Sequence, residues 1–163
     1  MIKLEFPLNV NLDSPRPIFK AFINNVPFRC MLDTGADIPV FCKGDLLFEK
    51  SVGEMDGVSK YKNSKIGGFG KTDEIVMLWN MDTFSLSDKK CAIDYKGMKI
   101  AVMNKPSIPC DIILSASMFM KMKYTIDCSI KKHLLTIEAN KNVYGVGYYD
   151  KKETIYIFSV NDN

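Results

Sequence analysis

The sequence Asp-Thr-Gly-Ala-Asp at positions 33–37 constrains the fold of this chain strongly, because it places a carboxylate between two apolar runs. The first run covers positions 30–32 and the second covers positions 38–41. We expect a buried strand to end at Asp33, so that its carboxylate stands at the strand tip. The chain must turn sharply there, and Gly35 permits the turn and a close approach of other backbone. Because the same residue types are common in ordinary polar turns, the motif needs support from the rest of the chain.

Composition and charge exclude several classes of protein. The chain has 163 residues, of which 47% are hydrophobic and 25% charged, as in an ordinary globular protein. We therefore expect one domain over residues 1–163. The net charge of +3 is too small to indicate nucleic acid, and the lysine pairs at 89–90, 131–132 and 151–152 are dispersed. No apolar run approaches the length of a membrane span, and the start lacks the apolar stretch of a signal peptide. We expect neither a nucleic-acid nor a membrane partner.

The cysteines indicate a reducing, cytoplasmic compartment. They stand at Cys30, Cys42, Cys91, Cys110 and Cys128. Their odd number and the absence of a C-x-x-C spacing argue against a disulfide framework and against a zinc site. We expect no metal and no organic cofactor.

The pattern along the chain predicts an all-β fold with little helix. We expect a hairpin over 18–32 with Asn24-Asn25 at its turn, and hairpins over 124–138 and 143–160. Short strands are expected at 38–42, 73–79 and 111–114, and a strand pair bent at Lys96-Gly97 over 91–103. Part of the polar segment 44–65 is expected to be a surface insertion. A short helix should follow position 114, capped by Ser115 or Ser117.

A second motif consists of Ile66, Gly67, Gly68, Phe69 and Gly70. Three glycines around one aromatic residue predict a flexible hairpin tip that can lie close over an extended peptide. Gly70-Lys71-Thr72 also looks like the end of a phosphate loop. However, Lys65 stands where that motif needs its first glycine, and a strand pattern follows where it needs a helix. A glycine-rich hairpin without any role is the remaining alternative.

The third motif is the apolar strand Asp111-Ile112-Ile113-Leu114, which is followed by Ser115. Together and in this order, the three motifs resemble those of the retropepsin-like (retroviral-type) aspartic proteases, over about residues 17–138. This resemblance implies a closed β-barrel, one half of an acid protease, with one short helix. Residues from about 139 to 163 would then form a C-terminal β-hairpin extension. The sequence departs from the family at Lys71, in place of the last flap glycine, and at Ser115, in place of a glycine beneath the catalytic loop.

The resemblance also assigns roles to residues. Asp33, Thr34 and Gly35 would be catalytic, with Thr34 bonded across a dyad axis and Gly35 lending backbone to the substrate. Ala36, Asp37 and the flap, Ile66 to Gly70, would bind the substrate. Asp37 is also compatible with an exposed turn acid. His133, the only histidine, is expected in a hairpin turn, which gives no support to a histidine-based triad or metal site.

Aspartic proteases need two carboxylates, of which one draws a proton from water and the other polarises the scissile carbonyl. The sequence contains no second D-T-G or D-S-G, so the second carboxylate must come from an identical chain. Our leading hypothesis is a homodimeric endopeptidase that cleaves peptide or protein substrates. The first alternative is a catalytically weak or silent module of the same fold that dimerises or binds peptides. The second is a β-rich structural protein with a coincidental D-T-G.

Overall fold

Strands make up most of the described chain, which in this computed structural model covers residues 1–163 except 12–13, 68–73, 121, 140–146, 150–153 and 159–163. The strands are β1 (Ile2–Asn11), β2 (Ser14–Ile23), β3 (Val26–Asp33), β4 (Val40–Phe41), β5 (Val58–Ile66), β6 (Glu74–Ser87), β7 (Ala92–Val102), β8 (Ile112–Ser115), β9 (Lys123–Asp127), β10 (Leu134–Ala139), β11 (Gly147–Tyr149) and β12 (Thr154–Phe158). The helical segments are α1 (Asp45–Phe48), its continuation η1 (Glu49–Gly53) and the single turn η2 (Ala116–Phe119).

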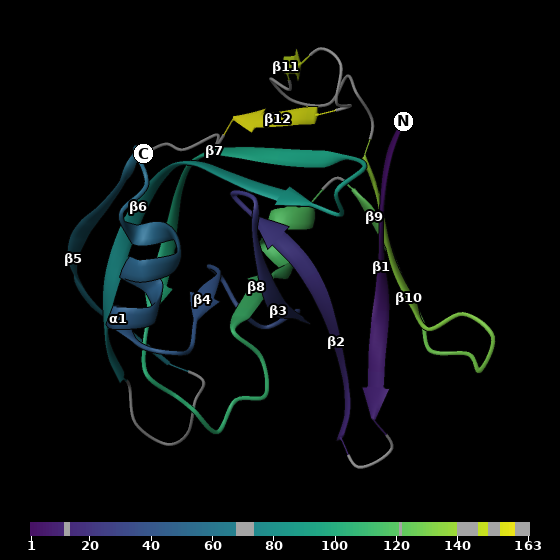
Figure 1. Ribbon diagram of the computed structural model, residues 1–163, viewed down its shortest axis with the longest axis horizontal. Coiled ribbons are helices and arrows are strands. Elements are labelled where there is room, and N and C mark those ends of the chain that lie inside the picture. Colours follow the sequence, from purple (N-terminus) through teal and green to yellow (C-terminus); the bar gives the residue numbers. More distant parts are fainter. Residues whose placement is uncertain (12–13, 68–73, 121, 140–146, 150–153, 159–163) are drawn as a thin grey trace.

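The strands close into a barrel. Hydrogen-bonded pairing runs from β2 through β3, β8, β4, β7 and β6 and returns to β2 (Figure 1). Within this ring, β3 pairs with β8 and β4 with β7 in parallel, while the other pairs are antiparallel. Outside the ring, β1, β10 and β9 extend the sheet beyond β2, and β12 joins β7. The expected all-β, closed-barrel fold is confirmed.

The β2–β3 hairpin turns at Asn24 and Asn25, as expected. Both residues have positive φ, of 49° and 67°, which is the conformation of a two-residue type I′ turn and one that asparagine tolerates. Asn24 also ties the turn to β6, because its amide donates to the Thr83 carbonyl at 3.0 Å and its side-chain oxygen accepts from the Ser85 amide at 2.8 Å. The two hairpins expected toward the end of the chain form as well, as β9–β10 and β11–β12.

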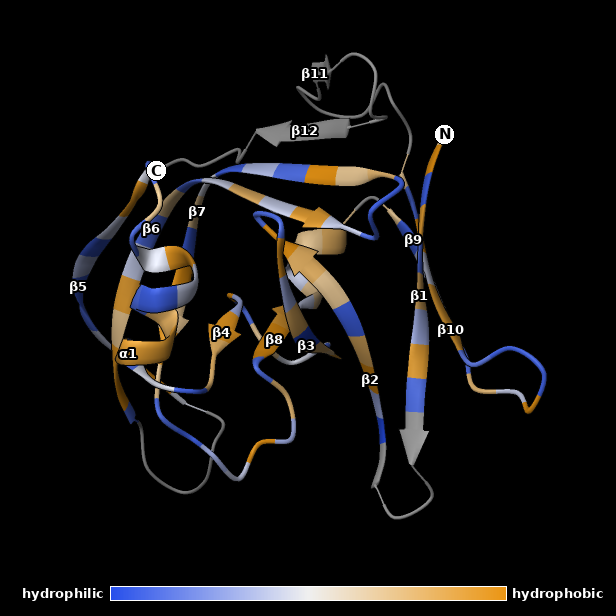
Figure 2. Ribbon diagram, in the orientation of Figure 1, coloured by the Kyte–Doolittle hydropathy of each residue, from blue (hydrophilic) through white to orange (hydrophobic). Residues whose placement is uncertain are grey.

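The N-terminal strand contributes to the core, although the sequence resemblance begins only near residue 17. In β1, Ile2, Leu4, Phe6 and Leu8 are all buried, while alternate residues point to solvent. These four side chains belong to the main apolar cluster together with residues of β2, β6 and β10. Figure 2 shows β4 and β8 in the hydrophobic colour. Their side chains at Val40, Phe41 and Ile112 to Leu114 are buried.

The structure adds to one expectation from the sequence and contradicts another. Segment 44–65, part of which is expected to be a surface insertion, begins with the helical turns α1 and η1, whose Phe48 and Val52 are buried. The Phe48 ring lies 4.9 Å from that of Trp79 and 5.3 Å from that of Phe41. Residues 91–103 form the single strand β7 rather than a strand pair. Gly97 adopts φ of 64°, which glycine permits without cost, so the strand bends there and continues.

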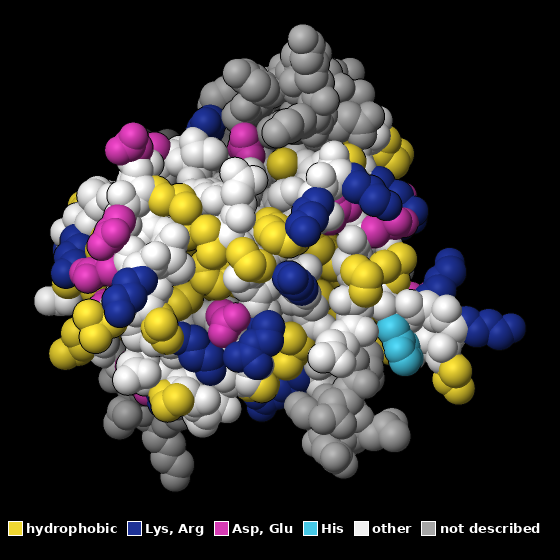
Figure 3. Space-filling view, viewed as in Figure 1, with side chains coloured by type: hydrophobic (Ala, Val, Ile, Leu, Met, Phe, Trp, Pro, Cys, Tyr) yellow, Lys and Arg dark blue, Asp and Glu magenta, His cyan; other side chains and the backbone are white. Residues whose placement is uncertain are grey.

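The surface is mixed in character. On the face shown in Figure 3, Lys and Arg side chains stand in several separate places among Asp, Glu and apolar side chains. In the described ranges, none of the helices combines the length and the apolar character that a membrane crossing requires.

Candidate active site

Asp33 is the last residue of β3, in the middle of the sheet. In the parallel pairing with β8 it lies beside Ser115. The strand is anchored by the fully buried Cys30, whereas Asp33 itself is half-buried. Thr34, Gly35 and Asp37 are exposed, and Ala36 is half-buried. The strand therefore delivers a carboxylate to the surface at a fixed point, as the sequence predicts.

The loop after Asp33 folds back onto the carboxylate. The Gly35 amide donates to Asp33 Oδ1 at 2.8 Å, and the Ala36 amide donates to the Asp33 carbonyl at 3.3 Å. These bonds close a tight turn and fix the direction of the side chain. One carboxylate oxygen is thus held by the loop, and the residue remains accessible for chemistry.

Two serines support the loop from β8 and η2. Ser115, which is fully buried, donates from its hydroxyl to the Ala36 carbonyl at 2.5 Å. Ser117 Oγ lies 2.9 Å from the Asp37 carbonyl oxygen and 2.6 Å from Ser115 Oγ. The Ser115 hydroxyl also accepts from the Ser117 amide at 3.1 Å, so Ser115 caps η2, and the predicted short helix and its cap are confirmed. The departure from glycine at position 115 is accommodated, and its hydroxyl is used by the loop.

The predicted flap is a long antiparallel hairpin of β5 and β6. Ile66 lies opposite Glu74, so residues 67–73 connect the two strands. Ile66 is half-buried and Gly67 exposed. The described residues do not include Gly68, Phe69 and Gly70. They also do not include Lys71, which stands in place of the last glycine of the family motif. β6 follows as a strand, which disagrees with a phosphate loop because that motif requires a helix at this point.

The Asp33 loop and the turn end of the β5–β6 hairpin share one apolar cluster. Its buried members are Val40, Cys42, Val76, Leu78, Ala101, Met103, Cys110 and Ile113. Ala36 and Ile38 pack against it from the loop, and Ile66 packs against it from the hairpin. Because close-packed side chains transmit displacement, the turn end of the hairpin and the Asp33 loop are positioned relative to each other.

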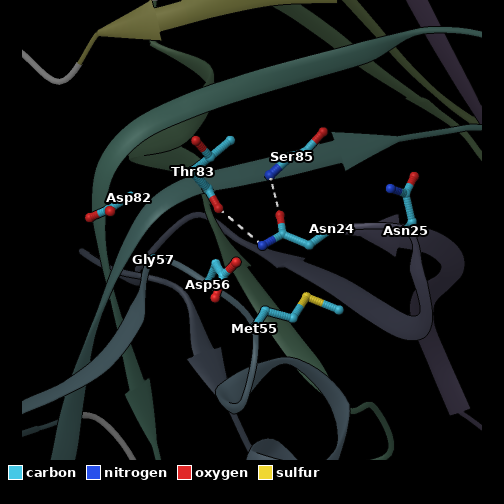
Figure 4. A pocket seen from close by; sticks show the side chains of 8 residues that line it. All are labelled: Asn24, Asn25, Met55, Asp56, Gly57, Asp82, Thr83 and Ser85. Atoms are coloured by element: carbon cyan, nitrogen blue, oxygen red, sulfur yellow. Dashed lines mark hydrogen bonds between the residues drawn. The ribbon is translucent and has the colours of Figure 1, made fainter.

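A surface depression of about 490 Å³ lies elsewhere and is no part of this site. Its lining residues are Asn24, Asn25, Met55, Asp56, Gly57, Asp82, Thr83 and Ser85 (Figure 4). The β2–β3 turn lies at the far end of β3 from Asp33, about 23 Å away at roughly 3.3 Å per residue. Figure 4 shows Asn24 directed at Thr83 and Ser85 of β6, so its polar groups are occupied in holding the turn.

Other polar candidates play structural parts. His133 lies in the β9–β10 turn with φ of 38°, as expected. In the described part of the chain, no three His, Cys, Asp or Glu side chains are grouped as metal ligands. Asp111, which directly precedes β8, links that strand to β3. Its carboxylate accepts a hydrogen bond from the Arg29 backbone amide at 2.8 Å and another from the Arg29 guanidinium at 3.3 Å. The sequence does not predict the Asp111–Arg29 hydrogen bonds or the contact of Ser117 with Asp37, since neither follows from a local pattern.

Similar folds occur among solved structures. The structure of a retropepsin-like aspartic protease from Rickettsia conorii aligns with a TM-score of 0.51 and 20% identity, covering 85% of this chain and 92% of that chain. EIAV protease, complexed with the inhibitor HBY-793, aligns with a TM-score of 0.40 and 20% identity, covering 69% of this chain and 92% of that chain. No protein-family profile and no curated protein matches the sequence. The first likeness shows that this chain has a retropepsin-like fold.

Proposed function

We propose that two copies of this chain form an aspartic endopeptidase that hydrolyses peptide bonds with the Asp33 carboxylates of both copies. The observation that carries the proposal is the Asp33 loop itself. Its carboxylate stands at the end of a central strand, with one oxygen held 2.8 Å from the Gly35 amide. Thr34 and Gly35 are exposed beside it, so this face is open to a partner and a substrate. The retropepsin-like fold supports the same reading.

The reaction requires a pair of carboxylates. Two that lie close together share one proton, because both cannot ionise at that separation. The ionised group takes a proton from water, the water attacks the scissile carbonyl carbon, and the protonated group donates a hydrogen bond to the carbonyl oxygen. One chain supplies a single Asp-Thr-Gly. A symmetric dimer supplies the second Asp33 from the same surface of the other copy.

The neighbouring residues have proposed roles of their own. Thr34 would bond across the dimer axis, and Gly35 would present backbone to the substrate. Ala36 and Asp37 would line the substrate's path on the loop side. The flap residues from Ile66 to Gly70 would close over an extended peptide from the other side and exclude water.

The competing function is a catalytically silent module of the same fold, which binds peptides or only dimerises. Ser115 is the described residue that favours it, because it replaces a glycine beneath the loop. Its hydroxyl bond to Ala36 nevertheless leaves the turn around Asp33 intact. The cysteine pattern places either function in the cytoplasm, as a prediction from the sequence.

A cleavage assay separates the two functions. The purified protein is incubated with a library of unfolded peptides, with and without pepstatin, and new termini are identified by mass spectrometry. We expect inhibitable cleavage that falls by about 100- to 10,000-fold in Asp33→Asn. Asp45→Asn, the same chemical change at an exposed position of α1, should keep wild-type cleavage. Equal cleavage by Asp33→Asn and wild type would sink the assignment, and no cleavage by wild type would favour the silent module.

A further inference from the structure

We infer that Ser115 and Ser117 are positioning residues that hold the Asp33 loop as a redundant pair, in which either hydroxyl alone suffices. The kinetic part of this inference rests on the proposed function. The structural part concerns only where the loop is held. The two serines do not touch the reacting atoms, and they act through the carbonyls of Ala36 and Asp37.

The two hydroxyls form a short chain of contacts to the loop. Ser115 Oγ lies 2.5 Å from the Ala36 carbonyl oxygen, and Ser117 Oγ lies 2.9 Å from that of Asp37. The two hydroxyl oxygens are 2.6 Å apart. All three distances are within hydrogen-bonding range. The chain of contacts thus joins two neighbouring loop carbonyls through two side chains.

Counting hydrogens shows that the three contacts cannot all be hydrogen bonds at once. Each serine hydroxyl carries one hydrogen, so the pair offers two donors for three contacts. Two bare oxygens at 2.6 Å would repel each other, so one hydrogen must lie between them. Only one hydrogen is then left for the loop. Either Ser117 donates to Ser115 and Ser115 to Ala36, or Ser115 donates to Ser117 and Ser117 to Asp37.

The distances favour the first arrangement, because its two bonds are the two shortest contacts. The second arrangement becomes available when Ser115 loses its hydroxyl, since Ser117 can then give its hydrogen to the Asp37 carbonyl. When Ser117 loses its hydroxyl, Ser115 still donates to Ala36. Each single deletion therefore leaves one loop bond, as many as in the wild type, and only the double deletion leaves none.

This bond has consequences at the carboxylate. The Ala36 amide donates to the Asp33 carbonyl, and the Ala36 carbonyl accepts from Ser115, so this one peptide segment is held on both sides. The preceding amide, that of Gly35, holds Asp33 Oδ1. A loop released from both serines would let this amide drift, and the carboxylate would lose its fixed direction.

The kinetic test compares Ser115→Ala, Ser117→Ala, the double variant and wild type. We expect each single variant to keep kcat within about threefold of wild type. The double variant should lose about tenfold more than the product of the single effects, with KM for the same peptide nearly unchanged. Ser117→Thr in the Ser115→Ala background keeps one hydroxyl and should restore the single-variant kcat. A single variant as slow as the double variant, or a double variant as fast as wild type, would overturn the inference.

A second readout does not depend on catalysis. Backbone ¹⁵N relaxation should give order parameters near 0.85 at Gly35, Ala36 and Asp37 in wild type and both single variants. In the double variant the values should fall below about 0.6. If the wild type cleaves no peptide, the proposed function fails while this measurement still decides the inference, and equal values in all four proteins would refute it. Should the double variant not fold, Ser115→Gly with Ser117→Ala removes the same hydroxyls and serves in its place.

Discussion

The amide of Gly35 donates to Oδ1 of Asp33 at 2.8 Å, and a Cβ built on Gly35 would lie 3.4 Å from that same oxygen. This is an ordinary van der Waals separation, and the backbone of Gly35 is outside the left-handed region. A single chain therefore tolerates a methyl group at this position. Any requirement for glycine must come from outside the chain, from a substrate or a second copy.

Gly35→Ala should consequently fold normally and lose activity. We expect its melting temperature to stay within about 2 °C of wild type, while kcat/KM falls about 100-fold because the substrate backbone is displaced. Gly57→Ala is the opposite control, since Gly57 has φ of 78° and its Cβ would meet the Asp82 side chain at 3.0 Å. That variant should melt at a lower temperature and keep its activity per folded molecule. Full activity in Gly35→Ala would contradict the proposed use of this loop.

Substitution at the proposed flap should lower kcat/KM without lowering stability. Phe69→Ala should lower kcat/KM about tenfold, because the closed flap would exclude water less well. Tyr61 offers a matched control on the same hairpin. The residue is 50% exposed, and the ammonium groups of Lys62 and Lys99 lie 5.3 and 5.2 Å from its ring centroid. If Tyr61→Ala and Phe69→Ala lower kcat/KM equally, the hairpin has no specific role at its tip.

The helical turn after Gly44 should be essential for stability. Phe48 is fully buried against Phe41 and Trp79, so Phe48→Ala should reduce the free energy of unfolding by about 3–5 kcal/mol. Leu47, the preceding residue, is 56% exposed. Leu47→Ala should change the free energy of unfolding by less than about 0.5 kcal/mol. Urea unfolding of both variants measures the difference, and similar values would mean that α1 does not dock as described.

Thiol chemistry should distinguish the cysteines by burial. Cys30, Cys42 and Cys110 are buried, and burial raises the pKa of the Cys30 thiol well above its usual range. The thiolate is the reactive form. Iodoacetamide at neutral pH should therefore modify the exposed Cys128 first and leave Cys30 unmodified until the protein unfolds. Peptide mapping of partly labelled protein reads out the order, and early labelling of Cys30 would refute its burial.

The central barrel and the Asp33 loop follow from the sequence because their signals are local. The Asn24-Asn25 turn, the apolar residues before Asp33 and the glycines near the flap each act within a few positions. The N-terminal strand had such a signal too, in the alternation of Ile2, Leu4, Phe6 and Leu8. The family motifs begin later in the chain, near residue 17, and so they do not include this strand.

The missing details depend on tertiary contacts. Phe48 lies in a polar stretch of sequence, and only the barrel supplies the Phe41 and Trp79 rings that pack against it. Val52 is buried in the same apolar cluster. Similarly, Gly97 signals a break in the strand pattern, yet pairing of β7 with β6 carries the strand through it. The contact between Ser117 and the Asp37 carbonyl joins residues 80 positions apart, and no local sequence pattern predicts it.

Mixing active and inactive chains tests most directly whether two Asp33 residues form one site. A fixed amount of wild type receives increasing amounts of Asp33→Asn, with time for the chains to exchange, and peptide cleavage is measured. If each active site needs one Asp33 from each copy, random pairing lowers the activity to about one half at equal amounts and about one quarter at threefold excess. Activity that stays constant as the inactive chain is added would show that a single chain is sufficient, and would contradict the shared site.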